Sequence, residues 1–250
     1  MHSNTMNSLG VIELLGRGQY EKVLRLLANR SDWTGIPEGR FWEIRGLAHY
    51  ALGEIPAAIN AFETANTLVT LSLVAQVSLA RCYLRQRFPL AAEAILSHLT
   101  AQPLTFENEI LCTGVAEGLS QLDMMPETIS VCRRSLSRFP QSHRLNFLCG
   151  MALRKETCPP GHARKYLQRA FRARPKSILY ATELAKECLD AGALDETARV
   201  LSEFDPSQLT CVAALQRLKL IYEQLGDEGM EQACSDRLRE MYYQVQSRFQ

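Results

Sequence analysis

A chain of 250 residues with 46% hydrophobic and 22% charged residues has enough apolar surface to bury a core, which excludes a wholly disordered protein. The formal net charge is +1, so the overall charge indicates no polyanionic partner. No stretch approaches the roughly 20 apolar residues of a membrane-spanning helix, and no basic segment followed by an apolar run begins the chain. We therefore expect a cytoplasmic protein without a signal peptide or a transmembrane segment, starting at Met1 or Met6.

The first predicted helical hairpin covers residues 7–39. Apolar side chains from Leu9 to Leu15 recur with the period of a helix. Gly18 ends this helix, because glycine disfavours helix interiors and readily adopts turn conformations. A second helical period starts at Tyr20, so the segment is predicted to fold back on itself.

The clearest hairpin is predicted for residues 40–70. Gly46 lets the two helices approach closely, because it has no side chain to separate the backbones. Gly53 forms the turn between them. Ala58 is a small residue where the second helix meets the first, and Phe62 fills the space beyond it.

The later hairpins follow at a regular spacing. The turn between paired helices recurs after 35, 33, 37, 35, 34 and 34 residues. The predicted turn positions are Gly18, Gly53, Gln86, Asp123, Cys158, Gly192 and Gly226. The predicted small positions of the second helices are Ala58, Ala91, Thr128, Ala163 and Thr197. Prolines near the ends of the second helices give a second, partly independent register.

Seven repeats result from these registers. Their predicted bounds are residues 7–39, 40–70, 72–104, 107–141, 144–176, 178–206 and 208–242. In the last repeat, Glu231 stands at the small position, or Ala233 does if the register shifts by two residues. We interpret this degenerate repeat as a cap with a solvent-facing surface, which a stacked array needs at its end.

Four residues of the second repeat have the spacing Trp-x3-Gly followed by Ala-x3-Phe: Trp42, Gly46, Ala58 and Phe62. With this pattern the unit resembles a tetratricopeptide repeat, although Arg45, His49 and Thr70 replace the Leu, Tyr and Pro of the family pattern. The resemblance implies an all-α fold, namely a right-handed α-solenoid of about seven stacked helix–turn–helix repeats in a single domain over residues 1–250. It also implies a protein-binding scaffold or adaptor.

In tetratricopeptide repeat proteins, one face of each first helix lines a concave groove that binds extended or helical peptides. The resemblance maps nine candidate partner-binding residues onto that face: Arg40, Glu43, Tyr50, Gln76, Tyr83, Thr113, Glu117, Lys155 and Lys186. For the tyrosines two interpretations stay open, contact with a partner or packing against the adjacent repeat. The Lys/Asn/Arg set that binds a C-terminal carboxylate in some family members is not found at matching positions, so chaperone-tail binding is not supported.

The charge is distributed unevenly. Residues 133–176 contain twelve Lys or Arg and one acid, a local net charge of +11, whereas residues 183–240 carry −7. Second helices face outward in this architecture, so we expect a basic ridge on the convex side. Its candidate residues are Arg133, Arg134, Arg138, Arg164, Lys165, Arg169 and Arg172.

Three interpretations of the basic ridge remain open. It docks an acidic protein or the acidic repeats of a second copy, it contacts nucleic acid or an anionic membrane surface, or it is a solvated face balanced by the acidic repeats. A nucleic-acid-associated repeat protein is the alternative function, because phosphate contacts need such a patch. No aromatic residues suited to base stacking are interleaved with it.

Motifs for catalysis or cofactor binding are missing from the sequence. It has no complete nucleotide-binding loop, no His-Glu-x-x-His and no Gly-x-Ser-x-Gly. None of the eight cysteines forms a Cys-x-x-Cys pair or has a histidine at metal-ligand spacing. We therefore expect no enzyme activity, no cofactor and no metal, and we expect the cysteines to be reduced core residues.

Overall fold

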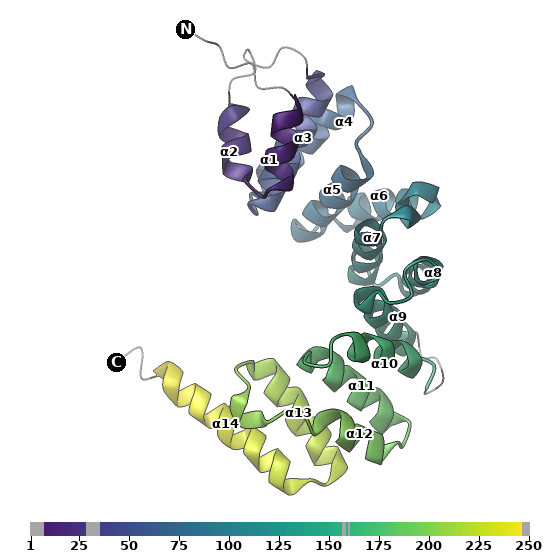
Figure 1. Cartoon of the computed structure of the whole chain (residues 1–250), viewed down its shortest axis with the longest axis vertical. Coiled ribbons are helices and arrows are strands. Elements are labelled where there is room, and N and C mark those ends of the chain that lie inside the picture. The colour runs from purple at the N-terminus through teal and green to yellow at the C-terminus, as the bar shows by residue number, and fades with distance from the viewer. Residues whose placement is uncertain (1–7, 29–35, 157–158, 160, 247–250) are drawn as a thin grey trace. The chain divides into compact units, whose positions relative to one another are not determined.

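The computed structural model describes residues 8–28, 36–156, 159 and 161–246. Within these residues the chain forms α-helices and two short 3₁₀ helices but no β-strand, which confirms the all-α class (Figure 1). The elements in order are α1 (Ser8–Gly16), α2 (Tyr20–Leu26), α3 (Glu38–Ala51), α4 (Ile55–Leu68), α5 (Leu73–Arg85), α6 (Pro89–Ala101), η2 (Pro103–Glu107), α7 (Glu109–Gln121), α8 (Met125–Leu136), α9 (His143–Lys155), α10 (Arg164–Ala173), α11 (Ile178–Asp190), α12 (Leu194–Leu201), η3 (Pro206–Gln208), α13 (Val212–Leu225) and α14 (Glu228–Gln246).

The helices belong to two compact units. Unit 1, Met1–Met124, contains α1 to α7, and unit 2, Met125–Gln250, contains α8 to α14. Within the units, consecutive helices pack as the predicted hairpins α1/α2, α3/α4, α5/α6, α9/α10, α11/α12 and α13/α14. The predicted repeat over residues 107–141 contributes α7 to unit 1 and α8 to unit 2. A single domain over residues 1–250 stays a prediction.

Each predicted turn has a residue with a left-handed backbone conformation at or near it. These residues are Gly18, Gly53, Arg87, Asp123, Gly161, Gly192 and Gly226. Five of the turns are where the sequence predicted them. The third lies one residue later than the predicted Gln86, because Arg87 takes the positive φ of 61°. The fifth predicted position, Cys158, lies outside the described residues, and the positive φ there belongs to Gly161.

The shift of the third turn also corrects the small position of its second helix. Ala92 is completely buried, whereas the predicted Ala91 is partly exposed. In the last repeat the fully buried small residue is Cys234, and neither Glu231 nor Ala233 is fully buried. The other predicted small positions are buried as expected: Ala58, Thr128, Ala163 and Thr197.

Close approach of paired helices depends on glycine in two of the hairpins. A Cβ atom added to Gly46 of α3 would lie 2.5 Å from Cδ1 of Phe62 on α4, so only glycine fits there. Gly150 of α9 faces Leu167 of α10 in the same way, at 2.7 Å from its Cδ2. The packing code predicted for residues 40–70 is therefore confirmed, and Phe62 is fully buried at its centre.

The cysteines are free thiols in the described part of the chain. Six are buried, and Cys211 is exposed at the start of α13, contrary to its expected burial. Burial raises the pKa of Cys82 and of Cys149 to about 11, because a thiolate is poorly solvated in the core. These two residues fill core space as small apolar groups.

Candidate partner-binding surfaces

Two of the predicted groove residues neutralise each other on α3. The Arg40 guanidinium forms an ion pair with the Glu43 carboxylate, one turn along the helix. Glu43 is only 5% exposed, and the pair compensates its buried charge. Arg40 is about half exposed and therefore accessible to a partner, whereas the Glu43 side chain is buried.

The two tyrosines pack between hairpins of unit 1. Tyr50 and Tyr83 both lie against a core cluster that includes Phe62 and Leu79. The Tyr83 hydroxyl donates a 2.8 Å hydrogen bond to Oε1 of Glu63 on α4. Burial, reinforced by this hydrogen bond and by the charge of Glu63, raises the pKa of Tyr83 to about 12. Both rings therefore make adjacent-repeat contacts, and their role in partner binding stays a prediction.

The Gln76 side chain is hydrogen-bonded to the backbone just before its own helix. Its Nε2 donates a 2.8 Å hydrogen bond to the carbonyl oxygen of Leu71, just before α5 begins. Gln76 stands eleven residues before the left-handed residue Arg87, as Trp42 stands before Gly53. We call this place in a repeat the capping position.

Donors at the capping position recur in the next two repeats. In unit 1, Sγ of Cys112 lies 3.2 Å from the carbonyl oxygen of Thr105. In unit 2, Nδ2 of Asn146 donates to the carbonyl oxygen of Pro140 at 3.1 Å. Asn146 stands fifteen residues before Gly161, but it precedes Gly150 by four residues, as Trp42 precedes Gly46. Each donor closes the loop in front of its own first helix, which satisfies a backbone carbonyl. Sequence reasoning missed this function because three unlike side chains perform it.

Helix α5 of the third repeat contacts α7 through two side chains, Val77 and Arg81, that were not among the predicted groove residues. A Cβ atom on Gly114 of α7 would lie 2.7 Å from Cγ1 of Val77. The Arg81 guanidinium forms an ion pair with the carboxylate of Glu117, a predicted groove residue. Thr113, another predicted groove residue, is buried. Val77 and Arg81 of α5 therefore both face α7.

A cavity of about 530 Å³ lies in unit 2, with a lining from α9, α11, α13 and the loop between α9 and α10. The predicted groove residues Lys155 and Lys186 both line it, so the structure brings these two together. Charged side chains dominate the lining. They are Arg154, Lys155, Lys186, Arg217, Glu183, Glu187 and Asp190.

Arg154 occupies the centre of this charged lining. Its Nη1 lies 2.8 Å from Oε2 of Glu183, its Nε 3.3 Å from Oε2 of Glu187, and its Nη2 3.3 Å from Oδ2 of Asp190. Glu187 also accepts a 3.0 Å hydrogen bond from the backbone N–H of Gly161. The guanidinium thus joins α9 to one face of α11, and Glu187 joins α11 to the loop that precedes α10.

Sequence reasoning missed the ion-pair network at Arg154, although the spacing of its acidic residues can be recognised in the sequence. Glu183, Glu187 and Asp190 recur at i, i+4 and i+7 and so share one face of α11. Their basic partner lies 29 residues before Glu183, in another hairpin, and the sequence does not indicate that pairing. Arg217 of α13 adds a further contact, 3.5 Å from Glu183.

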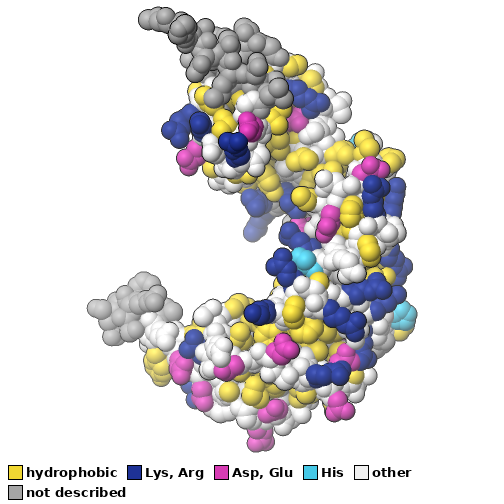
Figure 2. Space-filling model, viewed as in Figure 1, with side chains coloured by type: hydrophobic (Ala, Val, Ile, Leu, Met, Phe, Trp, Pro, Cys, Tyr) yellow, Lys and Arg dark blue, Asp and Glu magenta, His cyan; other side chains and the backbone are white. Residues whose placement is uncertain are grey.

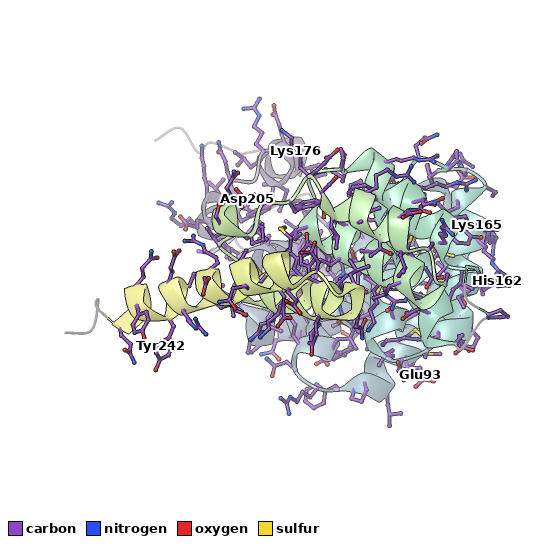
Figure 3. The ribbon with its side chains drawn as sticks, turned by 90° about the horizontal axis from the view of Figure 1, so that it is seen from below. Glu93, His162, Lys165, Lys176, Asp205 and Tyr242 are labelled. Carbon is purple, nitrogen blue, oxygen red and sulfur yellow. The ribbon has the colours of Figure 1, made fainter. Side chains whose placement is uncertain are left out.

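The residues of the basic ridge lie on and beside α8 and α10 of unit 2. Figure 2 shows Lys and Arg side chains concentrated along the edge that carries these helices. Arg164 forms an ion pair with Glu196 of α12, which neutralises part of the ridge. Lys165 lies over the Tyr166 ring, with Nζ 4.9 Å from the centroid, and it points outward on the same side as His162 (Figure 3).

Arg133, Arg134 and Arg138 are exposed on α8 or just after it. Arg169 and Arg172 are exposed on α10, where they line a hollow of about 380 Å³. The ridge is therefore an accessible basic surface, with a concave part at Arg169 and Arg172.

The described part of the chain offers neither a metal site nor a membrane-spanning helix. No group of three or more Asp, Glu, His or Cys side chains there could hold a metal ion. None of its helices is both long and apolar enough to cross a bilayer.

The paired helices and the glycine-mediated packing can be compared with solved structures. PilW, described as a widely conserved type IV pilus biogenesis factor, has a TM-score of 0.68 at 17% identity over 82% of this chain and 93% of its own. A TPR repeat-containing protein of Cytophaga hutchinsonii has a TM-score of 0.64 at 9% identity over 92% of this chain and 93% of its own. This chain has the tetratricopeptide repeat fold.

The same repeat fold is shared with PilF of Pseudomonas aeruginosa, at a TM-score of 0.65 and 14% identity, over 85% of this chain and 98% of that protein. No protein-family model matches the sequence, and no curated protein matches it. At these identities the structural likeness establishes the tetratricopeptide repeat fold. This confirms the resemblance inferred from the sequence at Trp42, Gly46, Ala58 and Phe62.

Proposed function

We propose that this chain is a protein-interaction scaffold and that the cavity at Arg154 holds a segment of its partner. One observation carries the proposal. Lys155 and Lys186, which the resemblance maps onto the peptide-binding face of tetratricopeptide repeat proteins, line the same 530 Å³ cavity. Stacked repeats characteristically present such concave surfaces to partners.

The chemistry of the lining suggests what the partner presents. Arg154 is held by three carboxylates, so its guanidinium forms a fixed floor. Lys186 is exposed and the Arg217 side chain is half exposed, which leaves their cationic groups accessible beside that floor. A partner segment with a carboxylate side chain would pair with these cations, and the rigid floor would lower the ordering cost of binding.

The proposed role is binding without catalysis or a cofactor, in the cytoplasm. No observation specifically favours nucleic-acid binding over protein binding. The tests on the basic ridge include nucleic-acid binding as one outcome. A role as adaptor between two proteins would require a second surface, which the basic ridge could supply.

Selection of peptides from a displayed random library tests the cavity. A selected peptide should bind the full chain, and binding should fall by about tenfold or more in the double variant Lys186→Glu/Arg217→Glu, because two attractive charges become repulsive. A matched control, Lys22→Glu/Arg25→Glu on α2, makes the same change in net charge and should retain binding. If selection yields no peptide, or if both double variants bind the selected peptide equally, the cavity is not the working surface.

A further inference from the structure

The exposed stripe of α10 consists of cations alone. Lys165, Arg169 and Arg172 recur at i, i+4 and i+7, so they share one face of the helix. No acidic residue occurs in α10. Neither Arg169 nor Arg172 has an ion-pair partner within the described part of the chain, in contrast to Arg164 with its Glu196.

A hollow lies next to these two guanidinium groups. Its volume is about 380 Å³, and it is lined by Pro140 and Gln141 of the loop between α8 and α9 and by Arg169, Arg172 and Ala173 of α10. Arginine presents a planar fork of N–H donors that matches a carboxylate or a phosphate. No carboxylate of the described chain pairs with these forks, so both are available to an anion from another molecule.

The surroundings distinguish between the possible anions. The aromatic residues nearest in sequence are poorly exposed: Tyr166 is buried, and Phe139 and Phe171 are only partly accessible. The ridge therefore has no open ring on which nucleic-acid bases would stack. The described residues between 125 and 176 also include no large hydrophobic side chain that is mostly exposed, as insertion into a membrane surface would require.

We propose that Arg169 and Arg172, with Lys165 on the same stripe, bind an acidic segment of a partner protein. Along the helix axis the two arginines are separated by about 4.5 Å, at 1.5 Å per residue. Side chains on one side of an extended peptide recur at about 6.6 Å. Acidic residues at alternate positions of such a segment can therefore reach both guanidiniums. This surface is separate from the cavity at Arg154, so either proposal can fail without the other.

Fluorescence anisotropy with a labelled peptide of six consecutive glutamates tests this assignment on the full chain. We expect binding that weakens as salt is raised, no binding of the matching six-glutamine peptide, and a loss of about tenfold or more in Arg169→Glu/Arg172→Glu. The Lys22→Glu/Arg25→Glu control should bind within about twofold of the natural sequence, because its charges lie on α2. Circular dichroism should show unchanged helicity in both variants, since all four positions are exposed.

Three results would overturn the proposal. One is an equal loss of affinity for the glutamate peptide in both double variants, which would show that binding depends only on the net charge of the protein. Another is tighter binding of a single-stranded oligonucleotide or of phosphatidylserine vesicles than of the peptide, again abolished by Arg169→Glu/Arg172→Glu. The third is concentration-dependent self-association in analytical ultracentrifugation that the same variant abolishes, which would assign the ridge to contacts between copies.

Discussion

The Arg154 guanidinium lies 2.8 Å from the Glu183 carboxylate, so a side chain of α9 is anchored on α11. Its other two contacts, with Glu187 and Asp190, make it the shared counter-ion of three acids. Glu187 is buried, and within the described chain Arg154 is the cation that pairs with it. Removing Arg154 would therefore leave a buried carboxylate without its counter-charge.

Replacing Arg154 by Ala should lower the free energy of unfolding by about 2–4 kcal/mol, because breaking such a pair exposes the desolvation cost of the remaining carboxylates. Urea unfolding monitored by circular dichroism measures the change. Lys186→Ala removes an exposed cation from the same cavity and should change stability by no more than about 0.5 kcal/mol. Equal effects of the two substitutions would show that the network does not stabilise unit 2.

Gly46→Ala should destabilise unit 1 by about 1–3 kcal/mol, because the new methyl group would overlap the Phe62 ring. The matched control is Gly10→Ala, where nothing lies within 4 Å of the new atom inside helix α1. That control should be neutral or stabilising by up to about 1 kcal/mol, since alanine favours helix over glycine. Thermal unfolding followed by circular dichroism compares the two, and equal midpoints would contradict the close helix approach.

Asn146→Asp should destabilise unit 2 by about 2–4 kcal/mol near neutral pH. Nδ2 of Asn146 donates to the carbonyl oxygens of Pro140 and of Ser142, and a carboxylate there would face two acceptors. The buried carboxyl would have a raised pKa in the folded state, so the deficit should shrink as pH falls toward the unfolded value of about 3.9.

Thermal midpoints at pH 7.5 and 4.5 measure this pH dependence. Asn60→Asp on the exposed side of α4 serves as the control and should have little effect at either pH. A deficit in Asn146→Asp that is independent of pH would mean that the capping hydrogen bond does not account for it.

Cys211 should react with a maleimide well before the buried cysteines at pH 7.5. It is the exposed thiol of the described chain, whereas burial holds the pKa of Cys82 and of Cys149 at about 11 and keeps both protonated. Peptide mapping by mass spectrometry identifies the modified residue, and Cys211→Ser should remove the fast modification of the peptide that contains position 211. Fast labelling of Cys82 in the folded protein would contradict its burial.

The same raised thiol pKa values predict a loss of stability in alkali. For Cys82 and Cys149 the folded pKa lies above the ordinary value of 9.0, so the folded state holds its protons longer than the unfolded state. Their contribution to stability is complete below pH 9 and is lost as pH rises toward 11. Urea unfolding at pH 8 and 10 should show the fall, and Cys82→Ala should reduce it.

The repeat architecture could be predicted because its signals are local. Gly18, Gly53, Gly192 and Gly226 mark turns by the conformational freedom of glycine, and Gly46 marks a close helix approach. The third turn was misplaced by one residue because Arg87 adopts the left-handed conformation without a residue type that announces it. That single shift moved the predicted small position from Ala92 to Ala91.

The candidate site was less predictable because its chemistry is non-local. Lys155 and Lys186 were identified from the repeat pattern alone, and they do line one cavity. The pairing of Arg154 with α11, and of Arg81 with Glu117, joins residues of different hairpins. Those partners depend on how the helices stack, which the sequence periodicity does not specify. The hollow at Arg169 likewise depends on where the loop at Pro140 lies.

The capping position has a consequence for how this chain is detected as a repeat protein. Gln76, Cys112 and Asn146 have different sizes, polarities and functional groups, yet each supplies one donor to a preceding carbonyl. A profile built on residue identities scores three mismatches to tryptophan there, although each side chain donates to a backbone carbonyl five to seven residues before it. Such a donor occurs in the third to fifth repeats, whereas Ala181 and Leu215, eleven residues before Gly192 and Gly226, have no side-chain donor.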